Sequence, residues 1–354
     1  MDIVRTTEER FPSLFGQLIR KTANVSWAYL PRFAEYQRLY AAGVLKEDCS
    51  FIFVQDGTPV CYCPLFLEEK GGERSLTYNQ SYLRAPIFDD TLDRKFQRKL
   101  RSRCFEEIDA VARTHSAAKA MLLVDPLAER ADFNYLSEYG FIDASIATVI
   151  VDLTKSDAEL WGELRKSYQS LINGGKRTYE IRIMDASAAD FEFHEQYRQL
   201  HHKAAGRVTR DRRTYDLQFE MLKDDNAILV GVKDPAKGAF VAFSYYFHHN
   251  GAVYYASSSD DPEYEATVPL EHTIIWGAVE YYKKRGFRRF EIGWQQFGTQ
   301  LLDPANKKDL SISFFKRGFG GMVVALYRGV KYYDKGLLLR DLSAVQTRLA
   351  AGEA

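Results

Sequence analysis

Residues 311–321, Ser-Ile-Ser-Phe-Phe-Lys-Arg-Gly-Phe-Gly-Gly, place a lysine and an arginine between aromatic residues and end in a glycine-rich turn. Glycine lets the backbone adopt positive φ and lets a ligand approach closely. A lysine at such a place can set a cation beside a carbonyl or phosphate oxygen in a partly desolvated pocket. The alternative is a strand end and a turn with an exposed Lys-Arg pair, because short motifs often occur by chance.

The chain has 354 residues, which is enough for two domains of about 150 residues, each with its own core. The formal net charge is zero, which excludes a protein that coats nucleic acid without specificity. No run of about 18 apolar residues predicts a transmembrane helix. The first ten residues are polar and acidic, unlike a signal peptide. We therefore expect a cytoplasmic protein, with a peripheral position at the inner membrane left open.

Neither the cysteines nor the histidines follow a metal-binding pattern. Two of the four cysteines flank a single residue inside an apolar run, which is poor spacing for zinc and gives no disulfide framework. We interpret all four as reduced core residues. Three histidines between residues 194 and 202 have no carboxylate or cysteine at metal spacing, and solvated or capping roles are expected for them. These residues are Cys49, Cys61, Cys63 and Cys104, and His194, His201 and His202.

The first half of the chain alternates helical and strand patterns. Asp56-Gly57 is a turn pair between two apolar runs, which predicts a β-hairpin. Apolar residues at spacings of three and four predict one long helix. Helices are expected at residues 11–21, 31–42 and 92–114, and strands at 50–55, 59–66, 120–124 and 144–153.

The second half repeats this order, and a helix in each half stops at Gly-Phe before a strand. Helices are expected at residues 161–175, 188–205 and 268–285, and strands at 227–232, 239–247, 252–257, 287–294, 309–315 and 322–327. The sequence thus predicts an α/β (α+β) chain of two similar domains, each a mixed sheet flanked by helices. Their expected bounds are 1–152 and 153–336, followed by a helical tail at 337–354.

The element order and three segments resemble the FemABX family of aminoacyl (non-ribosomal peptidyl) transferases, which consist of two tandem acyltransferase domains of the GNAT type. Residues 84–89, Arg-Ala-Pro-Ile-Phe-Asp, resemble the family's Arg-Gly-Pro-Val-x-Asp segment. Residues 204–207 with Tyr215 resemble the segment that reaches the acceptor. Residues 315–320 resemble Phe-Lys-x-x-Phe-Gly. The resemblance covers roughly residues 5–335.

The resemblance implies transfer of an aminoacyl group from charged tRNA to a primary amine of a cell-envelope or secondary-metabolite precursor, with no cofactor and no metal. The first domain would hold the acceptor and the second the donor. The implied catalytic residues are Lys316, which would stabilise developing negative charge, and Asp89 as a proton acceptor. The implied donor-binding residues are Phe315, Arg317, Gly318 and Phe319, and the implied acceptor-binding residues are Tyr82, Arg84, Arg207 and Tyr215.

The sequence departs from the family pattern in ways that leave the acceptor open. Ala85 replaces a glycine, Arg207 is followed by Val-Thr-Arg rather than Asp-Gly-Phe, and the helical arm of some members is missing. Asp90 is expected to cap the helix that follows it. The arginines of residues 207–213 form a basic loop that would bind phosphates of the acceptor, or else remain solvated.

The donor has a second interpretation. A protein that binds coenzyme A usually carries a glycine-rich loop before its long helix, where backbone N–H groups hold the pyrophosphate. Residues 260–267, Asp-Asp-Pro-Glu-Tyr-Glu-Ala-Thr, are acidic and lack glycine, which favours tRNA. An acyl-CoA-dependent N-acyltransferase acting on an amino sugar or amino acid is the alternative. The third hypothesis for the function is a non-catalytic binding protein with the same fold, since a fold does not determine a function.

Overall fold

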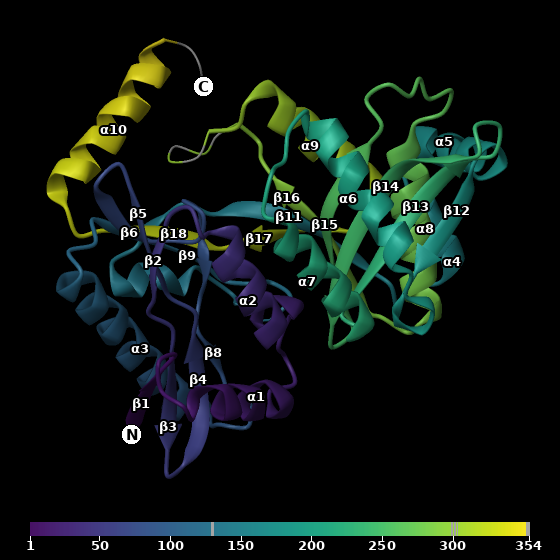
Figure 1. Ribbon diagram of the computed structural model, residues 1–354. Helices are drawn as coiled ribbons and strands as arrows, with labels where there is room; N and C mark the ends of the chain where they lie inside the picture. The colour runs from purple at the N-terminus through teal and green to yellow at the C-terminus, as the bar shows by residue number, and fades with distance from the viewer. Residues whose placement is uncertain (129–130, 299, 301, 303, 352–354) are drawn as a thin grey trace. The chain divides into compact units, whose positions relative to one another are not determined.

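A computed structural model describes residues 1–128, 131–298, 300, 302 and 304–351 of the protein. The chain divides into two compact units (Figure 1). Unit 1 consists of Met1–Ala147, Trp294–Ser311 and Ala325–Ala354, and unit 2 consists of Thr148–Gly293 and Ile312–Val324. The chain therefore returns to the first unit after completing most of the second, and strand β11 (Ile146–Asp152) begins in one and ends in the other.

Unit 1 is built on two sheets. The first has the strand order β1-β3-β4-β8, and the second has the order β10-β18-β9-β6-β5-β2, with β7 paired to β9. The strands are β1 (Asp2–Arg5), β2 (Leu45–Asp48), β3 (Phe51–Gln55), β4 (Thr58–Cys63), β5 (Phe66–Lys70), β6 (Glu73–Leu76), β7 (Leu83–Arg84), β8 (Ile87–Phe88), β9 (Lys119–Leu123), β10 (Ile142–Asp143) and β18 (Arg328–Tyr332). The helices are α1 (Phe11–Lys21), α2 (Pro31–Tyr40), α3 (Arg94–Thr114) and α10 (Lys335–Ala350), with short 3-10 turns η1 (Trp27–Tyr29) and η2 (Tyr135–Tyr139).

Helix α3 closes the core of unit 1 because its apolar stripe faces the sheets. Leu100, Cys104 and Ile108 on this stripe have no exposed surface. The four cysteines are all buried and free of disulfides, as predicted. The N-cap of α3 is Asp93, whose carboxylate accepts a hydrogen bond of 2.9 Å from the Phe96 N–H. The prediction that Asp90 caps this helix is wrong.

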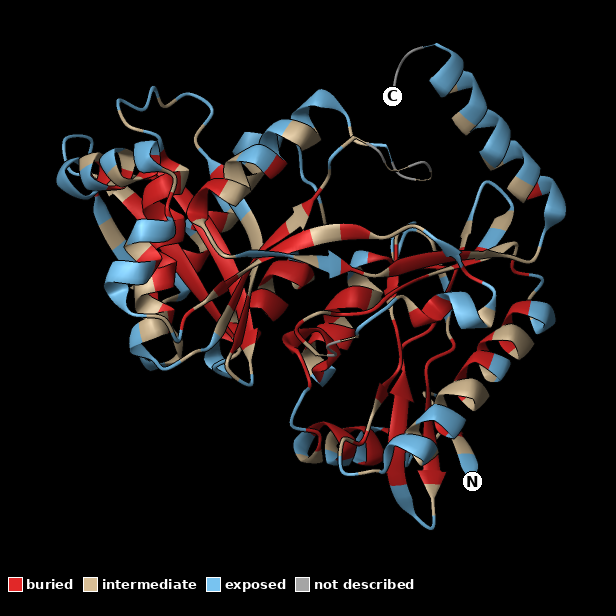
Figure 2. Ribbon diagram, turned by 180° about the vertical axis from the view of Figure 1, so that it is seen from behind, coloured by how far each residue is buried: buried red, intermediate tan, exposed pale blue. Residues whose placement is uncertain are grey.

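Unit 2 is a single sheet with helices on both faces. Its strand order is β12-β13-β14-β15-β16-β11-β17. Helices α6 and α7 cover one face, and α5 and α8 cover the other (Figure 1). Strands β13, β14 and β16 are largely buried, whereas the edge strands β12 and β17 and the outer faces of the helices are more exposed (Figure 2). The bounds are α4 (Asp157–Glu163), α5 (Lys166–Thr178), β12 (Glu180–Met184), η3 (Ala186–Ala188), α6 (Phe191–Ala205), α7 (Arg212–Lys223), β13 (Ala227–Asp234), β14 (Ala239–His249), β15 (Ala252–Asp260), α8 (Leu270–Lys284), β16 (Arg289–Gln295), α9 (Lys307–Lys316), η4 (Arg317–Phe319) and β17 (Met322–Leu326).

Two helices contradict the sequence prediction. Residues 309–315 were expected to form a strand, but they lie in α9. At its start the Asp309 N–H donates to the Asn306 side chain (3.0 Å) and the Asn306 N–H donates to the Asp309 carboxylate (3.2 Å). Such reciprocal capping favours a helix over a strand. Likewise, part of the predicted basic loop is the first turn of α7, which Asp211 caps by accepting from the Arg213 N–H at 2.7 Å.

Helix α5 runs through Gly174-Gly175, where the predicted helix was expected to stop. A Cβ atom on Gly175 would lie 1.8 Å from Oγ1 of Thr273 on α8, so this glycine lets the two helices approach closely. A Cβ on Gly174 would meet only Val268 at an ordinary 3.4 Å.

These neighbouring glycines give a matched pair of stability predictions. Gly175→Ala is expected to destabilise the protein by about 1–3 kcal/mol, because the added methyl overpacks the α5–α8 contact. Gly174→Ala is expected to stabilise it by up to about 1 kcal/mol, because alanine is the better helix former. Chemical denaturation of both variants measures the difference, and equal effects of the two would contradict the close packing at Gly175.

Candidate active site

The two central parallel strands of unit 2 separate part of the way along the sheet. Strands β15 and β16 pair only where Ala252–Tyr254 face Arg289–Glu291, although β15 continues to Asp260 and β16 to Gln295. Beyond the last pair the two strands no longer exchange backbone hydrogen bonds in a ladder. Side chains that enter this opening between β15 and β16 can meet a substrate there, since ligands in open α/β sheets bind at the carboxyl ends of parallel strands.

Lys316 is the last residue of α9, and its side chain extends into the opening between β15 and β16. A Cβ atom on Gly293 of β16 would lie 2.7 Å from its Nζ, so the ammonium group is packed against a place that only glycine leaves vacant. Gly293 has φ +117°, a conformation that other residues rarely adopt. On the other side, Nζ lies 5.9 Å from the ring centre of Tyr255 on β15.

The ammonium of Lys316 is half-buried and forms no ion pair or hydrogen bond with any residue that the structure describes. Burial lowers the pKa of Lys316, and the negative charge of Glu291 opposes part of this shift. A desolvated cation without a partner is suited to meet a negative charge that a substrate brings or develops.

A cluster of aromatic rings fixes the end of α9. Phe315 lies edge-on to His272 at 5.1 Å and to Phe319 at 5.3 Å, measured between ring centres. The Tyr168 hydroxyl donates to the carbonyl oxygen of Phe315 at 3.0 Å, and Arg165 donates to the carbonyl oxygen of Phe314 at 2.9 Å. Phe315 remains half-exposed, as a donor-binding ring would have to be.

The other predicted donor residues have packing roles. Phe319 is only 2% exposed and belongs to the core, so it cannot contact a donor in this arrangement. A Cβ on Gly318 would lie 2.2 Å from the Tyr168 ring, so this glycine makes room for Tyr168 and not for a ligand. The same holds for Gly320 and Gly321, which approach the backbone of α4 and β11. Arg317 is half-buried on η4.

A pair of carboxyl groups near Lys316 was not predicted. Glu271, in the first turn of α8, accepts a hydrogen bond of 3.0 Å from the Tyr255 hydroxyl. Asp260, at the end of β15, interacts with the same carboxyl group. Burial and the neighbouring Asp260 raise the pKa of Glu271 to about 8. In the sequence, Glu271 only looked like an acid at a helix N-terminus, and nothing there indicated that β15 faces it.

In unit 1, residues 85–88 of the predicted segment line a pocket of about 190 Å³, whereas Arg84 and Asp89 are not among its lining residues. The rim of this pocket carries Asp90, Arg101 and Asp125. Arg84 donates through Nε to Asp125 at 3.0 Å, and its guanidinium lies 4.9 Å from the ring centre of Trp27.

Two other predicted residues of unit 1 are largely buried. Tyr82 is 6% exposed and packs against the guanidinium of Arg328 at 4.3 Å. Asp89 is 4% exposed and pairs with Lys21 at 2.5 Å while Thr91 donates to it twice. Burial raises the pKa of Asp89, but the hydrogen bonds from Lys21 and Thr91 outweigh this and leave it below its usual value. A paired carboxylate with a low pKa is a poor proton acceptor, and the geometry favours a structural role for Asp89.

The predicted acceptor segment is exposed at residues 203–209 but ends in a buried residue, Tyr215. Tyr215 is fully buried and hydrogen-bonds to His201 at 3.0 Å, so it cannot contact an acceptor in this arrangement. Arg210 packs on the Tyr215 ring at 4.0 Å and donates to Gln218 at 2.7 Å. Only Arg207 of the predicted acceptor residues in this region is exposed.

His194 is neither solvated nor a helix cap, which corrects the prediction for this histidine, while His201 and His202 are partly exposed. His194 is 1% exposed and hydrogen-bonds to Tyr245 at 2.9 Å. Burial lowers the pKa of both His194 and His201 to about 4, so both rings are neutral at pH 7.

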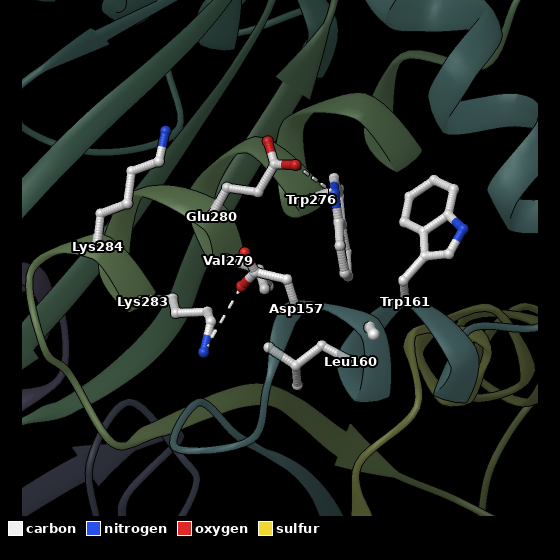
Figure 3. Close-up of a pocket in the computed structure, with 9 residues that line it drawn as sticks. Asp157, Leu160, Trp161, Trp276, Val279, Glu280, Lys283 and Lys284 are labelled. Carbon is white, nitrogen blue, oxygen red and sulfur yellow. Dashed lines mark hydrogen bonds and ion pairs between the residues drawn. The ribbon is translucent and has the colours of Figure 1, made fainter.

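In a second concavity of unit 2, most of the charged side chains are paired. It holds about 720 Å³ between α4 and the last turns of α8, and its walls include Trp161 and Trp276 (Figure 3). Glu280 accepts from Trp276 Nε1 at 2.8 Å and pairs with Lys176 at 2.6 Å. Lys283 lies 3.6 Å from Asp157. Because these charges pair with one another, this pocket offers less for catalysis than the opening that holds Lys316.

One group of side chains in unit 1 brings possible metal ligands together. Glu47, Cys49 and His115 each place one ligand atom within 4.8 Å of the others. Burial, aided by the negative charge of Glu47, raises the pKa of the Cys49 thiol to about 12, which disfavours the thiolate that a metal requires.

Comparison with known proteins identifies the fold. Residues 162–300 match the family model described as an acetyltransferase (GNAT) domain. The matched residues cover most of unit 2, which therefore has the fold of a GNAT-type acyltransferase domain. A comparison with curated proteins finds no significant match.

Solved structures resemble the whole chain. The crystal structure of FemX has a TM-score of 0.65 at 13% identity and covers 96% of this chain and 99% of its own. L-PGS from Bacillus licheniformis has a TM-score of 0.62 at 13% identity, covering 97% and 98%. A tandem GNAT protein from the clavulanic acid biosynthesis pathway has a TM-score of 0.51 at 12% identity, covering 94% and 98%. These likenesses confirm the FemABX-like tandem GNAT fold that the sequence resemblance implied.

Across the described part of the chain, no helix is both long and apolar enough to cross a bilayer.

Proposed function

We propose that the protein transfers an aminoacyl group from charged tRNA to a primary amine of a cell-envelope or secondary-metabolite precursor in the cytoplasm. The observation that carries this proposal is the ammonium of Lys316 in the opening between β15 and β16, which has no ion-pair partner among the residues that the structure describes. An amine that attacks an ester carbonyl creates an oxyanion, and a positioned cation stabilises it more than it stabilises the ground state.

The start of α8 supports tRNA over coenzyme A as the donor. A pyrophosphate would bind the N–H groups of the first helical turn. Here Pro269 occupies the N-cap, and the first turn carries Glu271 beside Asp260. A negative charge at this place would repel a pyrophosphate. Phe315 offers a half-exposed ring next to Lys316 on which the terminal base of a tRNA would stack.

An acyl-CoA-dependent N-acyltransferase acting on an amino sugar or amino acid is the second candidate. The match of residues 162–300 to an acetyltransferase domain favours it. For both candidates the reaction class is the same, transfer of an acyl group to an amine, and Lys316 has the same role.

The test is a donor-by-acceptor assay with the full chain. Purified protein is incubated with a mixture of aminoacyl-tRNAs or with acyl-CoA, each against a panel of amines, and new amides are detected by mass spectrometry. Amide formation from charged tRNA supports the proposal, and formation only from acyl-CoA supports the second candidate. Absence of an amide with every donor would contradict both. Deacylated tRNA serves as the control.

The net charge predicts how tRNA binds. Because residues 161–340 carry only a modest positive excess, 27 Lys and Arg against 22 Asp and Glu, the protein can neutralise only a few phosphates. We expect weak binding whose affinity falls about tenfold between about 50 and 200 mM salt, as for about two neutralised phosphates. Titration of tRNA at both salt concentrations measures this. Salt-independent binding, or none at low salt, would contradict tRNA as the donor.

A further inference from the structure

Glu271 and Asp260 bring two carboxyl groups together beside a tyrosine that also faces Lys316. The Tyr255 hydroxyl donates to Glu271 at 3.0 Å, while the ring of the same tyrosine lies 5.9 Å from Lys316 Nζ. Tyr255 thus touches the carboxyl pair with its hydroxyl and the catalytic lysine with its ring. The two carboxyl groups interact directly, and two adjacent carboxylates cannot both be ionised cheaply.

The groups around Glu271 come from every element packed against it. Strand β15 contributes Asp260 and Tyr255, and β14 contributes Tyr246, which is buried. On α8 itself the neighbour is His272, which α5 covers with the Tyr168 ring at 4.3 Å. Strand β13 presents apolar side chains to α8. None of these neighbours brings a positive charge against Glu271, so no described neighbour holds its carboxyl group permanently ionised.

Two further observations indicate that a ligand belongs here. Lys316 has no ion-pair partner among the described residues. His272 is 7% exposed, and neither of its ring nitrogens has a hydrogen-bond partner within the described chain. Buried polar groups are normally satisfied, so this imidazole, whose ring packs against Phe315 at 5.1 Å, marks a place that a polar ligand or ordered water would complete.

We propose that Glu271 is the proton acceptor for the incoming amine, with Tyr255 and Asp260 as positioning residues that hold and tune its carboxyl group. This inference rests on the proposed function. The amine nitrogen forms a bond to the donor carbonyl carbon and gives one proton to the Glu271 carboxylate. The carbonyl oxygen becomes an oxyanion beside Lys316. When the oxyanion collapses, the ester C–O bond breaks, and the departing oxygen receives the proton from Glu271. The products are an amide and an alcohol, and Glu271 is unchanged.

Glu271 lies in unit 2, whereas Asp89, the proton acceptor that the sequence resemblance implied, lies in unit 1. Asp89 is already paired with Lys21 and has a lowered pKa, whereas Glu271 has a raised one. A general base works best when its pKa lies near the working pH. Activity is therefore expected to rise with pH as Glu271 loses its proton, with a midpoint near pH 8.

The experiment compares Glu271→Gln with Glu280→Gln, a matched acid on the same helix that pairs with Lys176 away from the opening. With the donor that the wild type uses, Glu271→Gln is expected to lower kcat by about 10²-fold or more, and Glu280→Gln is expected to keep wild-type activity. Folding is checked by thermal unfolding of both variants.

The thermal measurement also separates catalysis from structure. Because the folded-state pKa of Glu271 lies above its unfolded value, its contribution to stability is present at low pH and is lost as pH rises toward about 8. Glutamine does not ionise, so Glu271→Gln removes the destabilisation that ionisation of Glu271 causes. The variant is therefore expected to have a higher Tm than the wild type at pH 8 while it is less active.

Two positioning variants shift the pH profile in opposite directions. Asp260→Asn removes the charge that raises the pKa of Glu271, so the rising limb of kcat is expected to move to lower pH. Tyr255→Phe keeps the ring but removes the hydrogen bond that lowers this pKa, so the limb is expected to move to higher pH. A merely structural cluster would not produce these opposite shifts.

The outcomes distinguish the two proposals. A wild type that forms no amide from any donor overturns the proposed function and this inference with it. An active wild type with full activity and an unchanged pH limb in Glu271→Gln overturns the inference alone. Loss of kcat in Glu271→Gln together with the opposite shifts supports it.

Discussion

Lys316→Ala is expected to lower kcat by about 10²–10³-fold, the usual cost of removing one group that stabilises an oxyanion. The affinity for the donor is expected to change much less, because the ammonium would act on charge that develops only in the transition state. Single-turnover kinetics together with equilibrium binding of the donor measure the two effects separately. A variant with wild-type turnover would refute the role of Lys316.

Two control variants sharpen this result. Lys308→Ala removes an exposed lysine from the same helix and is expected to be silent, since surface substitutions usually change stability by less than about 0.5 kcal/mol. Lys316→Arg is expected to restore little activity, because a planar guanidinium cannot occupy the compact space against Gly293. If Lys316→Ala also lowered Tm strongly, the role of the lysine would be to stabilise the folded turn rather than the transition state.

The sequence was sufficient to predict the fold, because the helix and strand patterns can be recognised along the chain, and it also pointed to Lys316, whose catalytic role stays a prediction. Helix periodicity located α3 and α8. The Phe-Lys-x-x-Phe-Gly segment pointed to residues 315–320. What the segment could not reveal is which of its residues face a ligand. Phe319 and Gly318 are fixed by their packing against Tyr168, a contact across about 150 positions of sequence.

The parts that sequence reasoning missed depend on tertiary contacts. The alternation Ser-Ile-Ser-Phe-Phe suggests a strand, but the reciprocal cap of Asn306 and Asp309 starts a helix instead. Glu271 looks like an ordinary acid in a first helical turn. Only the direction of β15, which brings Tyr255 and Asp260 against it, turns this acid into a group with a raised pKa.

Gly293→Ala is expected to remove most of the activity without touching a reacting group, with kcat falling at least tenfold toward the level of Lys316→Ala. The new Cβ would lie 2.7 Å from Lys316 Nζ, so the ammonium has to leave its place in the opening between β15 and β16. Alanine at the positive φ of +117° would also strain the backbone, which is expected to lower the free energy of unfolding by about 1–3 kcal/mol.

A control glycine and a double variant separate these two effects. Gly286, which follows α8 and also has positive φ (+77°), would carry a Cβ with no described atom within 4 Å beyond its chain neighbours, so Gly286→Ala introduces strain alone. It is expected to lower Tm and to leave kcat unchanged. If Gly293→Ala acts through the lysine, the double variant with Lys316→Ala is expected to be no slower than Lys316→Ala by itself, since coupled residues are not additive. Fully multiplicative losses in kcat would show that the glycine acts independently of the ammonium. The lower kcat of Gly293→Ala would then come from distortion of strand β16 and not from displacement of the Lys316 ammonium.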